Sequence, residues 1–134
     1  MEEKRPRVGS AVLVQHNGKF LLEKRNKENY NGYWIIPGEG VGFWETIKEA
    51  GIREIKEETN LNIEIIKSIG PKEIINIPGD YHGIVFFHLA KPKSIDIKSK
   101  DDLSEAKFFS IEEIKKLKIA ESVELILREE GFWK

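Results

Sequence analysis

Residues 46–59 constrain the fold of this chain more than any other segment, because their pattern predicts a helix with defined ends. Thr46 and Glu49 have the spacing of a capping box, in which each side chain accepts a hydrogen bond from the backbone of the other residue. Asn60 follows the segment, and asparagine tolerates the left-handed conformation that often ends a helix. We therefore expect a helix over residues 46–59.

The face of this helix that carries its small and apolar residues also carries glutamates. Successive residues advance by about 100°, so Glu54 and Glu58 fall within about 60° of Ile47 and Gly51. Ala50 lies on the same stripe. We therefore expect Glu54 and Glu58 to continue the buried face of the helix.

Burying glutamates in this way costs free energy. The carboxylates of Glu54, Glu57 and Glu58 would repel one another within one turn, and partial burial adds to the cost of ionisation. A cation among them would remove that cost, and hard oxygen ligands suit Mg²⁺ or Mn²⁺. The alternative is that these glutamates form a solvated or salt-bridged helix face, as most runs of charged residues do.

The segments around this helix predict an α+β fold, with a mixed sheet flanked by helices. Apolar runs predict strands over residues 8–15, 20–24, 34–36, 63–69, 73–77, 83–90 and 106–109. Turns are expected at residues 16–19, 70–71 and 78–80, and a glycine-punctuated loop at residues 38–42. A second capping box, Ser110 with Glu113, predicts a helix to about residue 118, and a further helix is expected over residues 121–130.

Composition excludes several classes of function. The 134 residues are the length of one domain, which we expect to span residues 1–134. The absence of cysteine excludes disulfides and thiolate chemistry, and a net charge of −1 argues against binding to polymeric nucleic acid. With no apolar run of ~18 residues and no signal-like start, we expect a cytoplasmic protein without a membrane anchor.

Residues 38–61 resemble the signature of the Nudix hydrolases, the MutT-like family. Glu45 is followed by seven residues and then by the run Arg53-Glu54-Ile55-Lys56-Glu57-Glu58-Thr59-Asn60-Leu61, which places the arginine and all four glutamates of the signature at its spacing. Glu39 and Asn60 depart from it, since they stand where the signature has glycine, and Gly42 and Trp44 occupy places often held by glutamate and glycine. The resemblance implies an α/β/α sandwich with a loop-helix-loop catalytic motif.

The same resemblance implies metal-dependent hydrolysis of a nucleoside diphosphate linked to another group. Glu54, Glu57 and Glu58, with the Gly38 carbonyl, would hold one to three Mg²⁺ or Mn²⁺ ions. Water would attack phosphorus, as in other phosphoryl transfers.

The resemblance also implies roles in proton transfer and in positioning. Glu57 or Glu54 would take the proton from water. A base from a later loop, Glu105 or Asp102, is the alternative. Arg53 and Glu45 would orient the metal-binding glutamates.

The substrate is a small nucleotide on this interpretation, with a nucleoside triphosphate or a nucleotide sugar favoured. Arg25 could meet a phosphate. Trp34 and Trp44, together with Phe43 and Tyr81, could stack a base, although core packing also explains Trp34. Glu105 is a further candidate contact. A nucleotide-binding module without hydrolysis stays an alternative, and a homodimer, common in the family, stays open.

Overall fold

The computed structural model describes residues 4–26, 30–97 and 105–134, and their order is ββββ-α-βββ-αα. The strands are β1 (Arg7–His16), β2 (Lys19–Lys24), β3 (Trp34–Ile35), β4 (Gly38–Gly40), β5 (Ile63–Asn76), β6 (Tyr81–Pro92) and β7 (Glu105–Ser110). The helices are α1 (Ile47–Thr59), α2 (Ile111–Ile114) and α3 (Glu121–Glu129).

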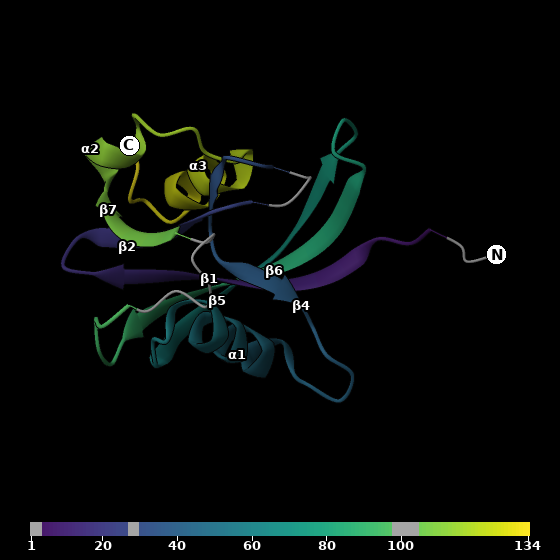
Figure 1. The fold of residues 1–134 in the computed structure, drawn as a ribbon, viewed down its shortest axis with the longest axis horizontal. Helices are drawn as coiled ribbons and strands as arrows, with labels where there is room; N and C mark the ends of the chain where they lie inside the picture. Colours follow the sequence, from purple (N-terminus) through teal and green to yellow (C-terminus); the bar gives the residue numbers. More distant parts are fainter. Residues whose placement is uncertain (1–3, 27–29, 98–104) are drawn as a thin grey trace.

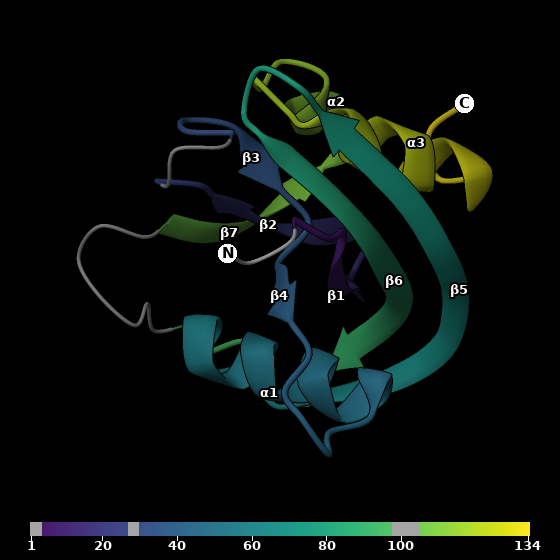
Figure 2. The same ribbon diagram turned by 90° about the vertical axis from the view of Figure 1, so that its right-hand side faces the viewer.

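The strands form a mixed sheet of seven strands around β1. The main path is β3-β2-β1-β6-β5, in which β1 and β6 are parallel and the other neighbours antiparallel; β4 pairs with β1, and β7 with β2. Figure 2 shows β5 and β6 as a long curved hairpin beside β1. The mixed sheet expected from the sequence is confirmed.

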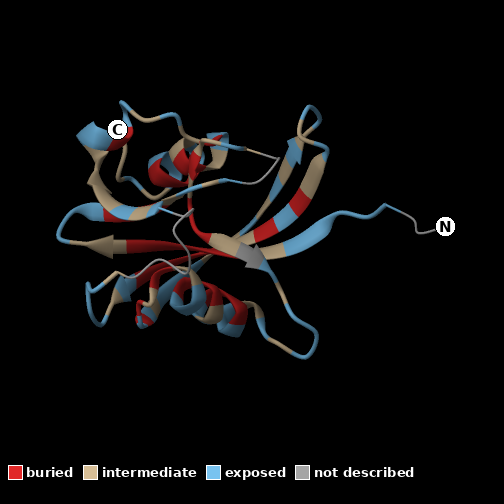
Figure 3. Cartoon of the chain, viewed as in Figure 1, coloured by how far each residue is buried: buried red, intermediate tan, exposed pale blue. Residues whose placement is uncertain are grey.

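Helices cover both faces of this sheet, with α1 on one side and α2 and α3 on the other (Figure 1). On the α3 side, Leu13 and Leu22 belong to the same buried cluster as Ile126. On the α1 side, Val12 and Ile55 belong to a second cluster. Figure 3 shows the resulting band of buried residues along β1. The chain is therefore an α/β/α sandwich with a core on each side of the sheet.

Helix α1 begins and ends where local chemistry predicts. The Thr46 hydroxyl accepts from the Glu49 backbone N–H at 3.1 Å, while the Glu49 carboxylate accepts from the Thr46 N–H at 2.9 Å. Asn60 ends the helix with φ of 67°. The predicted capping box and left-handed end are both confirmed, so the chain direction on each side of α1 is fixed locally.

Gly51 allows α1 to approach the sheet closely. A Cβ on Gly51 would lie 2.8 Å from Cγ2 of Val12 and 3.1 Å from Oγ of Ser10. The Ser10 hydroxyl donates to the Ile47 carbonyl of α1 at 2.7 Å, which joins the helix to β1 by a hydrogen bond as well. These contacts fix the distance between α1 and the sheet, and therefore the position of the α1 glutamates.

Two of the predicted connections are regular strands instead. Residues 38–40 form β4, since Gly38 lies so close to Ser10 and Ala11 of β1 that no side chain would fit there. The expected turn at Gly70-Pro71 is wrong, because both residues lie inside β5. Proline is tolerated because β5 is an edge strand of the sheet. The pairing of β5 with β6 also shifts register twice just before Pro71, between residues 65 and 70. Helix α2 is also shorter than expected.

Candidate functional site

Arg53 is the centre of a charged cluster that extends from the loop before α1 to the last turn of that helix. Its Nε and Nη2 atoms donate to the two carboxylate oxygens of Glu45, at 2.6 and 2.9 Å. Its Nη1 atom donates to Glu54 and, at 3.3 Å, to Glu57. Nη2 also donates to the Gly40 carbonyl at 3.2 Å. One guanidinium therefore ties three carboxylates of the predicted site to β4.

Glu45 is held from two sides. The Gly42 backbone N–H donates to its Oε1 at 2.9 Å, in addition to the two bonds from Arg53. These hydrogen bonds, with that of Arg53 the largest effect, lower the pKa of Glu45 from 4.5 to about 2. The hydrogen bonds of Arg53 to Glu45 and Glu54 raise the pKa of Arg53 above its ordinary value. Glu45 and Arg53 are consequently an ion pair at neutral pH, and this pair fixes the loop before α1.

The three glutamates in the last turns of α1 differ in exposure. Glu54 is buried, with 5% of its surface exposed, and faces the sheet with Ala50 and Gly51 as the helical phase predicts. Glu58 is half-buried, and the Glu57 side chain is 43% exposed. A carboxylate that must exchange a proton with water is best placed at Glu57, whereas Glu54 is shielded from bulk solvent.

The donor set fits a divalent cation. Glu54 is buried, Glu57 and Glu58 follow it within about one turn of α1, and hard oxygen atoms are the ligands that Mg²⁺ and Mn²⁺ prefer. In the described part of the chain, no three acidic or histidine side chains already converge on one point. The Arg53 guanidinium donates hydrogen bonds to three of these carboxylates, those of Glu45, Glu54 and Glu57.

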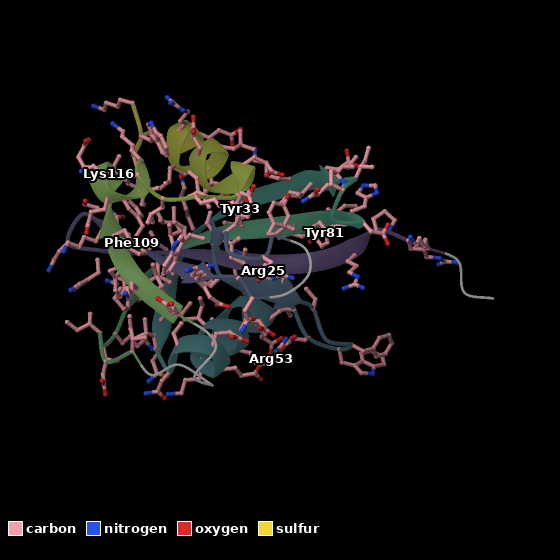
Figure 4. The ribbon with its side chains drawn as sticks, turned by 45° about the horizontal axis from the view of Figure 1, so that its top comes forward. Arg25, Tyr33, Arg53, Tyr81, Phe109 and Lys116 are labelled. Carbon is pink, nitrogen blue, oxygen red and sulfur yellow. The ribbon has the colours of Figure 1, made fainter. Side chains whose placement is uncertain are left out.

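A cavity of about 320 Å³ lies beside this cluster. Gly38 and Gly40 of β4 line it, and the Gly40 carbonyl is the same one that accepts from Arg53. Arg25, which directly follows β2, also lines it. In Figure 4, Arg25 lies between Tyr81 and Arg53. The cavity and the carboxylates thus meet at β4.

Comparisons with known proteins show the family and the fold. The family model described as NUDIX domain matches residues 3–129. This chain belongs to the Nudix hydrolase family. Over 129 residues it is 31% identical to the ADP-ribose pyrophosphatase of Methanocaldococcus jannaschii, a match that covers 96% of this chain and 75% of that protein.

Solved structures share the Nudix fold. A MutT NUDIX hydrolase from Burkholderia pseudomallei superposes with a TM-score of 0.84 at 23% identity, over 93% of this chain and 98% of that one. A bifunctional NMN adenylyltransferase/ADP ribose pyrophosphatase from Francisella tularensis, complexed with AMP and a Mn ion, gives a TM-score of 0.78 at 27% identity. That match covers 97% of this chain and 43% of the Francisella chain.

Other residues predicted for this Nudix site lie elsewhere. Trp34 is buried, and its ring centroid lies 4.9 Å from that of Phe109 in an edge-to-face contact. It also bridges to Ile119 before α3, so the structure shows the core packing that the sequence allowed for Trp34. Trp44 is 93% exposed at the tip of the loop before α1. Glu105 begins β7 and pairs with Lys107 at 3.7 Å.

The predicted alternative base at Asp102 lies outside the described residues. Two of the predicted substrate contacts that are described, Arg25 and Tyr81, line the cavity. The others are not among the lining residues: Trp34, Phe43, Trp44 and Glu105. None of the described helices is long and apolar enough to cross a membrane.

The sequence did not point to three residues of the cavity wall. Arg7, Tyr30 and Ile74 all line the cavity, from β1, from the loop before β3 and from β5. The Tyr30 hydroxyl donates to Glu121 at 2.5 Å, and burial followed by this contact raises the pKa of Tyr30. No local sequence pattern joins these three segments, because they are distant in sequence. The one sequence feature that could have pointed to this wall is the basic residue Arg7 at the start of the first strand.

Proposed function

We propose that this Nudix hydrolase cleaves the diphosphate linkage of a nucleoside diphosphate joined to a sugar, with ADP-ribose as the first candidate substrate. The observation that carries the proposal is the Arg53 cluster, which lies at the rim of a ligand-sized cavity and shares Gly40 with it. The similarity to an ADP-ribose pyrophosphatase over nearly the whole chain supports the same substrate class.

The residues that would hold Mg²⁺ or Mn²⁺ are Glu54, Glu57 and Glu58, with the Gly38 carbonyl. A divalent ion bound there supplies charge neutralisation for the diphosphate and acidifies water. Gly38 fits this role because its backbone is held against β1 at the cavity wall. The number of ions is one to three on this proposal.

The chain's own residues supply proton transfer, positioning and phosphate binding. Glu57, the most exposed carboxylate of the cluster, accepts the proton of the attacking water. Arg53 holds the metal-binding glutamates in position, because its hydrogen bonds to Glu45 and Gly40 fix the guanidinium. Arg25 neutralises a phosphate of the substrate inside the cavity.

A hydrolysis screen tests this proposal. Purified protein is incubated with ADP-ribose, a nucleotide sugar, a nucleoside triphosphate and a dinucleoside polyphosphate, each with Mg²⁺ and with Mn²⁺, and products are separated by chromatography. We expect AMP and ribose 5-phosphate from ADP-ribose, and loss of turnover when the metal is chelated. Binding of ADP-ribose without any product would instead favour the nucleotide-binding module.

A further inference from the structure

The ring of Tyr81 covers Gly83 on the cavity face of β6. Alternate residues of a strand share a face, and Tyr81, Val85 and Phe87 all line the cavity. A Cβ on Gly83 would collide with the Tyr81 hydroxyl, and would lie 2.7 Å from its Cζ and 3.0 Å from its Cε1. The tyrosine ring therefore leans along β6 and occupies the space where a side chain at position 83 would stand.

The strand neighbours of Gly83 place different side chains on the two sides of the Tyr81 ring. Gly83 pairs with Ile74 of β5 and with Arg7 of β1, and both of these residues line the cavity. The ring is thus seated between strand positions that carry an apolar and a cationic side chain. Tyr30 lines the same cavity and interacts electrostatically with Tyr81.

An aromatic face in a small cavity suits a planar ring. Stacking on aromatic side chains recognises any nucleobase, because every base has a π-face. The arginines at positions 7 and 25 provide positive charge for the phosphate of the same nucleotide. The volume of about 320 Å³ lies at the small end of ligand sites, which suits one nucleoside rather than a whole dinucleotide.

We propose that Tyr81 is the platform on which the nucleobase of the substrate stacks, and that Gly83 is the positioning residue that makes room for the ring. The proposal rests on the proposed function for the nucleotide class of the ligand. It adds that this chain selects substrates that carry a nucleobase. Gly83 sets this selectivity, because it leaves the space that the Tyr81 ring occupies.

Binding of AMP tests the platform directly, because AMP has a base, needs no hydrolysis and is the expected product. Dissociation constants are measured by calorimetry for AMP and for ribose 5-phosphate, which lacks the base. We expect Tyr81→Ala to weaken AMP binding by about 5- to 150-fold, the range for loss of one stacking contact. Tyr81→Phe, which keeps the ring, should bind AMP within about 3-fold of the wild type. Binding of ribose 5-phosphate should be unchanged.

A double mutant tests the role of Gly83. The three nearest atoms to a Cβ at this position all belong to Tyr81, so Gly83→Ala should displace the ring and weaken AMP binding. The same substitution should have no further effect in the Tyr81→Ala background. Ile84→Ala, on the opposite face of β6, is the control. Thermal unfolding of each variant confirms that it is folded.

The inference would be overturned if the wild-type protein did not bind AMP, or if Tyr81→Ala bound AMP as tightly as the wild type. It would also be overturned if Gly83→Ala weakened AMP binding equally in the wild-type and Tyr81→Ala backgrounds. Loss of ribose 5-phosphate binding in Tyr81→Ala would also overturn it, since the effect would then not depend on the base. Tyr81-dependent AMP binding without any hydrolysis would leave the platform intact and refute the proposed function instead.

Discussion

Both carboxylate oxygens of Glu45 accept hydrogen bonds from Arg53, one from Nε at 2.6 Å and one from Nη2 at 2.9 Å. This two-point contact crosses from the loop before α1 to the middle of the helix. Because the planar guanidinium also reaches Gly40, the loop, the helix and β4 are held by a single side chain. The geometry of the candidate site therefore depends on this pair.

Replacing Arg53 with lysine should damage activity more than stability. A lysine ammonium cannot reproduce the two-point contact to Glu45 together with the bond to Gly40. We expect kcat for ADP-ribose to fall by about 10- to 100-fold, the usual cost of losing a residue that orients a metal ligand. Arg128→Lys is the matched control, since Arg128 pairs with Glu124 on α3, away from the site. Equal activity of Arg53→Lys and wild type would refute this role.

The stabilising effect of Glu45 should depend on pH with a defined sign. Its pKa in the folded chain is about 2, below the usual 4.5, so ionised Glu45 stabilises the fold above pH 4.5. That contribution is lost as pH falls from 4.5 toward 2. We expect the difference in free energy of unfolding between wild type and Glu45→Gln, measured with urea, to shrink steadily as pH falls from 5 to 3. A difference that stayed constant over this range would contradict the ion pair.

Gly51→Ala should destabilise the protein, although alanine usually favours a helix over glycine by about 0.8–1.0 kcal/mol. The added methyl group would lie 2.8 Å from the buried Val12 and 3.1 Å from the Ser10 hydroxyl. Overpacking of this kind costs about 1–3 kcal/mol, which outweighs the helix preference. We expect a net loss of about 1 kcal/mol in chemical denaturation. An increase in stability would show that α1 does not pack on β1 as described.

His88 should make stability depend on pH near neutrality. It is 3% exposed, its Nδ1 lies 3.4 Å from the Ser68 hydroxyl, and its Nε2 has no hydrogen-bond partner among the described residues. Burial, followed by the charge of Lys48, lowers its pKa below 6.5. The unfolded chain therefore takes up a proton more readily than the folded one as pH falls below 6.5, and stability declines.

The measurement is chemical denaturation of wild type and His88→Gln between pH 8 and pH 5. We expect the wild type to lose stability relative to the variant as pH falls through this range, because glutamine does not titrate. Parallel curves for the two proteins would show that His88 does not carry the dependence.

Local features of the site were predictable from the sequence, because their causes lie within a few residues. The Thr46–Glu49 capping box, the left-handed Asn60 and the buried phase of Glu54 are all consequences of helical geometry. The spacing of Arg53 from Glu45 also carried enough information to place them together. Helix α1 and the loop before it thus contain most of the charged cluster, in one continuous segment of sequence.

Non-local features were not predictable. Pro71 seemed to mark a turn, yet it lies in the edge strand β5, where a missing N–H is tolerated. Trp34 and Trp44 look alike in sequence, but one packs in the core and the other is 93% exposed. Arg7 and Tyr30 join one cavity only because the sheet topology brings β1 beside the loop before β3. No local pattern contains that information.

The measurement that tests the central claim most directly is the steady-state hydrolysis of ADP-ribose, with Mg²⁺, by Glu57→Gln. The substitution removes the base but keeps the size of the side chain, so kcat should fall by about 10²–10⁴-fold while the thermal midpoint changes little. Glu124→Gln is the matched control, because Glu124 also forms an i,i+4 pair with an arginine, on α3, and it should keep wild-type activity. Wild-type turnover by Glu57→Gln would contradict the account, since the α1 glutamates would then not perform the reaction.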